Sequence, residues 1–123
     1  MTKRILIIED QEDNRAIMRD LLSTAGYALI EAVDGEEGVR LARSERPDLI
    51  LMDIQLPVLD GYEATRRIRA IADLKSVPII AVTSYALSGD EAKTREAGCD
   101  SYVAKPFSPR ELLAKVRALL PSG

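Results

Sequence analysis

Apolar residues follow two alternating patterns along the chain. Short runs rich in β-branched residues lack polar alternation, which is typical of strands buried on both faces of a parallel sheet. Longer segments between these runs place apolar residues at helical spacing, which predicts amphipathic helices. The predicted strands are Arg4–Ile8, Ala28–Ala32, Leu49–Met52, Val77–Val82 and Ser101–Ala104.

Helix boundaries and buried helix faces are also visible in the sequence. Ser108 and Glu111 form a capping box with Pro109 at the first helical position, and Asp34 and Ser88 start segments of the same kind. Gly26 and Gly98 are placed to end helices. The predicted apolar faces are Ile17, Met18, Leu21, Leu22 and Ala25, then Ala64, Thr65, Ile68 and Ile71, and finally Leu112, Leu113, Val116, Leu119 and Leu120.

Two of the predicted helices have unusual surfaces. The helix over Gly89–Ala97 has a thin apolar face, essentially Ala92 and Ala97, so it is only weakly anchored. A basic cluster of Arg66, Arg67 and Arg69 is interpreted as a solvated helix face.

A strand followed by a helix is repeated five times, which predicts an α/β fold with a doubly wound five-stranded parallel sheet. The five units use residues 1–123 as a single domain and leave neither a linker nor a second domain. We therefore expect no DNA-binding output domain after the last helix.

Composition excludes several function classes. The chain has no His, which removes His-type zinc sites, Ser–His nucleophile pairs and a phosphohistidine on this chain. Its single Cys, Cys99, allows no internal disulfide, so a cytoplasmic, reducing location is expected. A net charge of −3 argues against a nucleic-acid partner, and no apolar run is long enough for a membrane span.

Candidate chemistry gathers at the carboxyl ends of the predicted strands, where ligands bind in open parallel sheets. Asp and Thr after a strand are also common helix caps, but capping does not require several acids and one Lys at three strand ends. The residues are Glu9 and Asp10, then Asp53, then Thr83 and Ser84, and then Lys105 and Pro106.

Clustered carboxylates repel one another and favour a hard divalent cation with oxygen ligands, which suits Mg²⁺. With Asp10 holding the metal, and Glu9 holding it through water, Asp53 becomes a nucleophile for phosphorus that forms an acyl phosphate. Lys105 and the Thr83 hydroxyl would stabilise the transferred phosphoryl group.

This combination resembles a response-regulator receiver domain of the CheY-like superfamily over the whole chain. The motifs are the pair Glu9-Asp10, the segment Leu51-Met52-Asp53-Ile54-Gln55-Leu56-Pro57, then Gly61, Thr83 and Lys105-Pro106. The segments around Pro47–Asp53 and Glu96–Asp100 are most similar to stand-alone DivK-type regulators.

The resemblance implies a flavodoxin-like (βα)5 fold with strand order 2-1-3-4-5, and it implies roles for individual residues. Asp53 would be the phosphoacceptor, and Mg²⁺ would be bound by Asp10, Asp53 and the backbone carbonyl of Gln55. Glu9 stands where Asp is more usual. Thr83 and Lys105 would bind the phosphoryl group, Tyr102 would be an aromatic switch residue, and the Lys105–Pro106 peptide bond would be cis.

The function implied is a single-domain response regulator, a monomer or weak dimer, that receives phosphate from a sensor histidine kinase or histidine phosphotransfer protein. Output would be binding of a downstream protein through the fourth helix, fifth strand and fifth helix. Gln55 and Tyr85 would tune the phosphoryl lifetime.

A Mg²⁺-dependent aspartate-nucleophile phosphohydrolase is the alternative, but such enzymes carry a second Asp where this chain has Gln55. A third possibility is an inert pseudo-receiver that serves as a scaffold. The complete acidic site argues against it, because a scaffold would not need those residues.

Overall fold

Five parallel strands form one sheet in this computed structural model, which describes residues 2–84 and 90–120. The strands are β1 (Arg4–Ile8), β2 (Ala28–Ala32), β3 (Leu49–Asp53), β4 (Ile79–Thr83) and β5 (Ser101–Ala104). Their order across the sheet is β2-β1-β3-β4-β5. The predicted fold class and the strand order are therefore confirmed.

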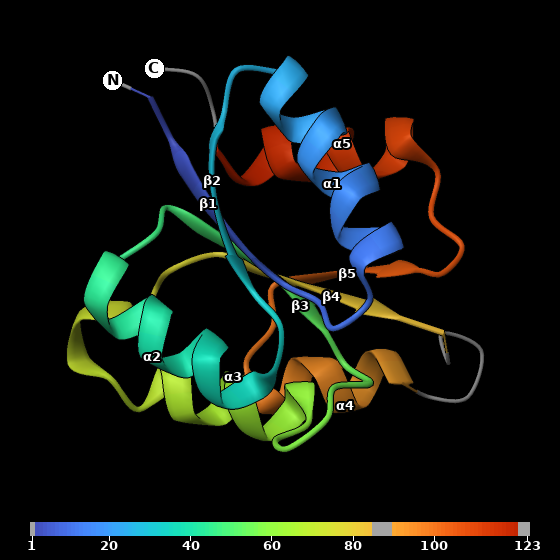
Figure 1. Ribbon diagram of the computed structural model, residues 1–123. Helices are drawn as coiled ribbons and strands as arrows, with labels where there is room; N and C mark the ends of the chain where they lie inside the picture. The colour runs from blue at the N-terminus through green and yellow to red at the C-terminus, as the bar shows by residue number, and fades with distance from the viewer. Residues whose placement is uncertain (1, 85–89, 121–123) are drawn as a thin grey trace.

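Helices cover both faces of the sheet (Figure 1). They are α1 (Glu12–Thr24), α2 (Gly35–Glu45), α3 (Gly61–Arg69), α4 (Asp90–Ala97) and α5 (Pro109–Leu119), with a 3₁₀ turn η1 at Ala72–Leu74. In Figure 1, α1 and α5 lie on one face, and α2, α3 and α4 lie on the other. None of the helices within the described ranges is long and apolar enough to cross a membrane.

The limits of two strands differ from the prediction. β3 continues through Asp53 because that residue still pairs with Val82 of β4. β4 begins at Ile79 and not at Val77, since Pro78 has no N–H to contribute to the ladder. The carbonyl of Pro78 still accepts a hydrogen bond from the Ile50 N–H at 2.9 Å. The shift places Thr83 inside the end of β4.

The predicted caps are confirmed within the described residues. The side chains of Asp34 and Ser108 accept hydrogen bonds from the N–H groups three residues on. Gly26 and Gly98 follow helix ends with φ values of +100° and +118°, where glycine avoids the clash that a Cβ would cause. The cap predicted at Ser88 lies outside the described residues.

The core alternates along each strand between the two faces. In β1, Ile5 and Ile7 pack with the residues under α1 and α5, whereas Leu6 and Ile8 pack toward α2 and α3. All four are essentially inaccessible. Burial on both faces explains why the strand sequences lack polar alternation.

Two predictions about apolar helix faces were wrong. Ile17 is 49% exposed because it lies at the edge of α1 and lines a surface pocket. Ala92 of α4 is exposed, and the buried position is Thr94, whose hydroxyl donates to the carbonyl of Glu91. Since a hydroxyl bonded within its own helix can be buried, the inward face of α4 is less apolar than a count of alanines suggests.

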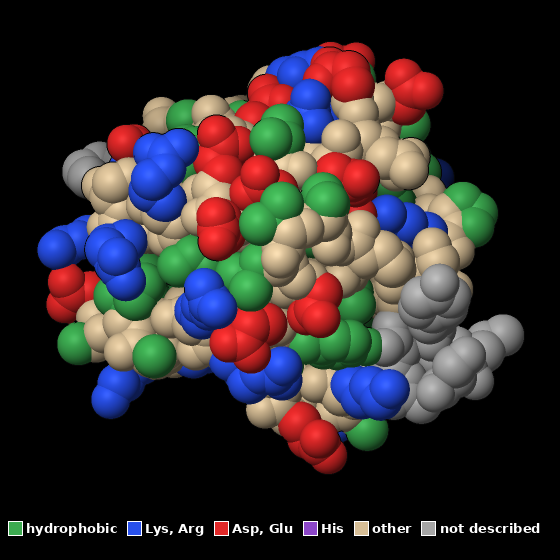
Figure 2. All heavy atoms as spheres, turned by 60° about the horizontal axis from the view of Figure 1, so that its bottom comes forward, with side chains coloured by type: hydrophobic (Ala, Val, Ile, Leu, Met, Phe, Trp, Pro, Cys, Tyr) green, Lys and Arg blue, Asp and Glu red, His purple; other side chains and the backbone are tan. Residues whose placement is uncertain are grey.

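The basic cluster on α3 is only partly a solvated face. Arg66 and Arg67 are exposed and both pair with Glu63. Figure 2 shows that acidic and basic side chains are mixed on the side of the molecule formed by α2, α3 and α4. The Arg69 side chain is only 17% exposed and pairs with Asp100. Its guanidinium also donates to the carbonyls of Leu74, Val77 and Gly98. Arg69 thus joins α3 to the turns that flank β4 and β5, and the prediction was wrong for this residue.

Gly61 allows α3 to start directly against the end of β3. A Cβ at this position would lie 2.4 Å from the Asp53 carbonyl oxygen and 2.7 Å from the Ile54 Cα. We expect Gly61→Ala to lower the free energy of unfolding by about 2 kcal/mol, since backbone atoms cannot move aside as a side chain can.

Urea unfolding measures this loss. Gly26→Ala is the comparison, because no atom from elsewhere in the described structure lies within 4 Å of a Cβ at Gly26, and only the local backbone at its positive φ opposes the change. A cost for Gly61→Ala no larger than that of Gly26→Ala would contradict the close approach.

Candidate functional site

Three acidic side chains meet at the carboxyl edge of the sheet, as predicted. One carboxylate oxygen from each of Glu9, Asp10 and Asp53 lies within 4.8 Å of the others. Glu9 and Asp53 are buried, and Asp10 is exposed. They converge because β1 and β3 are neighbours, with Ile8 paired to Met52 just before the cluster.

Lys105 brings a positive charge to this cluster from the end of β5. Its Nζ donates to Asp53 Oδ2 at 3.0 Å and lies 3.3 Å from Glu9 Oε1. Burial disfavours the ammonium charge, but the hydrogen bonds and negative charges of Asp53 and Glu9 outweigh it and raise the pKa of Lys105. The predicted cis peptide between Lys105 and Pro106 is present.

Glu9 is fully buried between the other two carboxylates and Lys105. Its Oε2 accepts a hydrogen bond from the Gln11 N–H, and its buried Oε1 has only the ion pair with Lys105, at 3.3 Å, as a partner within the described part of the chain. Burial, together with the hydrogen bond and charge of Asp53, raises the pKa of Glu9 to about 7. A buried oxygen facing two further carboxylates is what a divalent cation would stabilise, and the all-oxygen donor set suits Mg²⁺.

Gln55 connects Asp53 to the end of β4. Its N–H donates to Asp53 Oδ1 at 3.0 Å, and its side-chain Nε2 donates to the Thr83 hydroxyl at 3.3 Å. The amide oxygen accepts from the Ser84 N–H at 3.4 Å. The sequence placed Gln55 and Thr83 at this edge. The structure adds that Gln55 links Asp53, through its backbone N–H, to the buried Thr83, through its side chain.

Tyr102 lies half-buried in β5, on the sheet face that α4 covers. The Lys115 Nζ lies 5.1 Å from the centre of its ring and also donates to the Tyr102 carbonyl. The negative charge of Glu91 in α4 and its hydrogen bond raise the pKa of the Tyr102 hydroxyl. Tyr102 therefore touches both α4 and α5. Tyr85, the other predicted aromatic of the site, lies outside the described residues.

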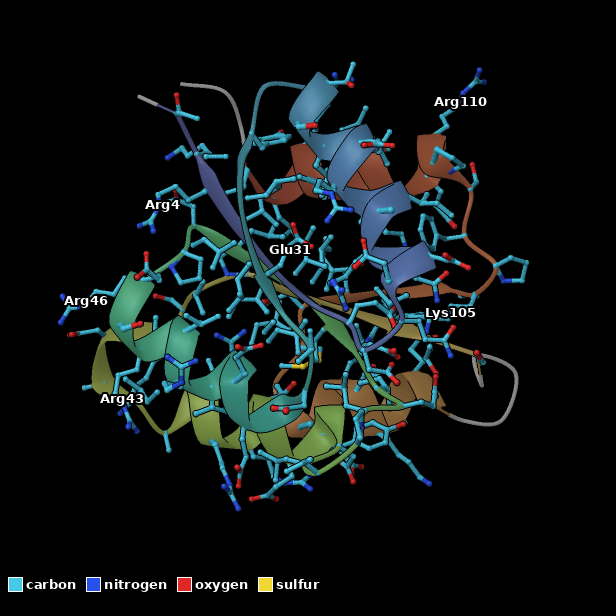
Figure 3. All side chains as sticks on the ribbon, viewed as in Figure 1. Arg4, Glu31, Arg43, Arg46, Lys105 and Arg110 are labelled. Atoms are coloured by element: carbon cyan, nitrogen blue, oxygen red, sulfur yellow. The ribbon has the colours of Figure 1, made fainter. Side chains whose placement is uncertain are left out.

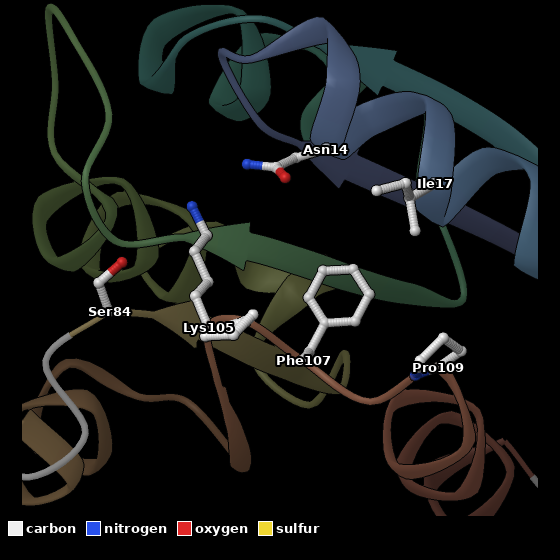
Figure 4. A pocket seen from close by; sticks show the side chains of 7 residues that line it. Asn14, Ile17, Ser84, Lys105, Phe107 and Pro109 are labelled. Carbon is white, nitrogen blue, oxygen red and sulfur yellow. The ribbon is translucent and has the colours of Figure 1, made fainter.

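A surface pocket of about 450 Å³ opens beside Lys105 (Figure 4). Ile17 of α1 and Phe107 and Pro109 after β5 form its apolar wall, and Asn14 and Ser84 lie at its polar side. The sequence did not predict this pocket, because Ile17 was assigned to the core. The exposure of Ile17 is visible only in the structure, so the sequence held no signal for this pocket.

Comparison with known proteins agrees with the family resemblance found in the sequence. The chain matches the response regulator receiver domain over residues 5–117. It is 42% identical over 120 residues to the polar-differentiation response regulator DivK of Brucella ovis, covering 98% of both chains.

Solved structures of similar proteins include two receiver-type domains. The receiver domain of the sensor histidine kinase PA1611 from Pseudomonas aeruginosa PAO1 is 43% identical with a TM-score of 0.92, and the match covers 99% of this chain and 100% of that one. That crystal structure has a magnesium ion coordinated in its active-site cleft. The chemotaxis response regulator CheY4 of Vibrio cholerae is 27% identical with a TM-score of 0.92, covering 97% and 99%.

Proposed function

Because the chain belongs to the response regulator receiver domain family, we propose that it is a switch in two-component signalling, controlled by phosphorylation of Asp53. The observation that carries the proposal is the Asp53 carboxylate, which is buried beside Glu9 and Asp10 and bonded to Lys105. A sensor histidine kinase or a histidine phosphotransfer protein would supply the phosphoryl group, since this chain has no His.

The reaction proposed is transfer from a partner's phosphohistidine. A carboxylate oxygen of Asp53 bonds to phosphorus as the phosphorus–nitrogen bond breaks, and the imidazole leaves with that electron pair and takes up a proton. Lys105 is placed to exchange its bond to Asp53 for one to a phosphoryl oxygen, and Thr83 can donate to another.

Asp10, Asp53 and the backbone carbonyl of Gln55 are the residues proposed to hold Mg²⁺, with Glu9 acting through water. Mg²⁺ supplies positive charge that stabilises the transferring phosphoryl group when bound. Glu9 supports this assignment because its buried Oε1 has one ammonium, Lys105, 3.3 Å away in a cluster of three carboxylates, so a bound cation would add positive charge that the cluster lacks.

Output is proposed to pass through the surface of α4, β5 and α5 to a downstream protein. Tyr102 supports this assignment because its ring and carbonyl contact Lys115 of α5 while Glu91 of α4 lies at its hydroxyl. A movement of Tyr102 would therefore alter two helices at once.

Gln55 and Tyr85 are proposed to tune the lifetime of the phosphoryl group. The hydrogen bonds of Gln55 to Thr83 and Ser84 hold its amide beside Asp53, where it restricts the approach of water. The role of Tyr85 rests on its position two residues after Thr83.

Incubation with Mg²⁺ and labelled acetyl phosphate tests the proposed function. We expect a labile acyl phosphate that saturates at no more than one per chain, and no labelling when EDTA removes the metal. Continued release of phosphate through many fast turnovers would instead identify a phosphohydrolase, and the absence of any adduct would identify an inert scaffold.

A further inference from the structure

The short loop that carries Glu9 and Asp10 is held by an arginine from the next helix. Arg15 of α1 is 12% exposed, and its Nη1 donates to the backbone carbonyl of Glu9 at 2.9 Å. On the other side of the same residue, the Glu9 N–H donates to the carbonyl of Ala32 at the end of β2. Both peptide groups that flank Glu9 are therefore fixed, including the one that leads into Asp10.

Arg15 is itself held by two carboxylates. Its Nε lies 3.2 Å from Glu31 Oε1, and its Nη2 bonds to Glu12. Figure 3 shows Glu31 between β2 and α1, where it can reach this helix. A guanidinium bonded on three sides has little freedom to leave the Glu9 carbonyl.

Arg19, one turn further along α1, shares both carboxylate partners. It lies 2.8 Å from Glu31 and 3.0 Å from Glu12. Of these two arginines, however, only Arg15 bonds to the acidic loop within the described part of the chain. The chain thus contains two arginines in one network, and a single contact distinguishes them.

We propose that Arg15 is a positioning residue for the Mg²⁺ site, acting through the backbone carbonyl of Glu9. This inference rests on the metal site of the proposed function and adds a residue from outside it. With that carbonyl fixed, the Glu9–Asp10 peptide has one orientation, so both carboxylates face Asp53 before a cation arrives. Preorganised ligands bind a metal more tightly because less order is lost on binding.

Charge alone predicts the opposite effect of removing Arg15. Arg15, Arg19, Glu12 and Glu31 together have no net charge. Loss of either arginine leaves this network with one excess negative charge, close to the acidic site of Glu9, Asp10 and Asp53. That charge would make the acidic site attract Mg²⁺ more strongly. Weaker binding in Arg15→Ala therefore cannot come from the lost charge.

Calorimetric titration with Mg²⁺ alone provides the test. We expect Arg15→Ala to bind Mg²⁺ about tenfold more weakly than the wild type, as is usual when a group that orients metal ligands is lost. Arg19→Ala should bind as the wild type does or slightly more tightly. Arg15→Lys, which keeps the charge and can still reach the carbonyl, should recover part of the affinity.

Amide NMR spectra without metal give a second measurement. The signals of Asp10 and Gln11 should move in Arg15→Ala and stay in place in Arg19→Ala. If Arg15→Ala does not fold, the same comparison is made with Arg15→Lys, which should show smaller shifts at the same two amides.

Equal Mg²⁺ affinities for the two alanine variants, or tighter binding by both, would overturn the positioning role and leave the proposed function intact. A wild-type protein that binds no Mg²⁺ would overturn both. A wild type that binds Mg²⁺ but accepts no phosphoryl group from acetyl phosphate would overturn the proposed function alone.

Discussion

Asp53→Asn is expected to abolish phosphoryl incorporation from acetyl phosphate and Mg²⁺. Asn keeps the shape of the side chain but is not a nucleophile toward phosphorus under these conditions. Neither neighbouring carboxylate should replace it, since Glu9 is fully buried with one oxygen bonded to the Gln11 N–H, and Asp10 makes no ion pair with Lys105 within the described residues. Phosphate-affinity electrophoresis after short incubation measures the adduct directly.

The same substitution should leave the fold intact. Lost attraction to Lys105 and lost repulsion from Glu9 and Asp10 oppose each other, so stability should stay within about 1 kcal/mol of wild type. Asp73→Asn is the matched control, because Asp73 is 59% exposed and pairs with Arg46 at the surface. Equal labelling of Asp53→Asn and this control would refute the assignment of the phosphoacceptor.

The placement of the acidic cluster could be predicted from the sequence because it depends on strand ends alone. Apolar runs without polar alternation locate the strands, and parallel strands bring their carboxyl ends to one edge. Asp53 and Lys105 then meet by topology, although β4 separates β3 from β5. The order of the strands came from the family resemblance and not from the pattern.

The contacts of the arginines could not be predicted in this way. Arg15 and Arg69 bond to backbone carbonyls, and every residue of a chain offers the same carbonyl group. The sequence therefore gives no sign of which carbonyl a guanidinium will reach.

Helical spacing has a related limit. It identifies the side of a helix that faces the sheet but not how far neighbouring elements extend over its edge. Ile17 is left half-exposed for this reason, because the pocket wall formed with Phe107 does not close over it.

Thr83→Ala is expected to separate phosphorylation from signalling. Asp53, Asp10 and Lys105 all remain, so the variant should still accept phosphate from acetyl phosphate. Thr83 is fully buried, and its hydroxyl accepts from Gln55 at the edge of the acidic site. A new phosphoryl group offers that hydroxyl a stronger acceptor, and its reorientation is the step proposed to let Tyr102 move.

The position of the Tyr102 ring is the readout, since no partner protein is needed for it. With Mg²⁺ and beryllofluoride, a phosphate mimic, the wild type should show large shifts of the Tyr102 ring and Lys115 side-chain NMR signals as their contact changes. Thr83→Ala should lose most of these shifts while binding the mimic, and Thr83→Ser should restore them. Ser84→Ala is the control, because this exposed neighbour meets Gln55 only through its backbone N–H. Full Tyr102 shifts in Thr83→Ala, or a ring that stays in place in the wild type, would show that the signal does not travel from Thr83 to Tyr102.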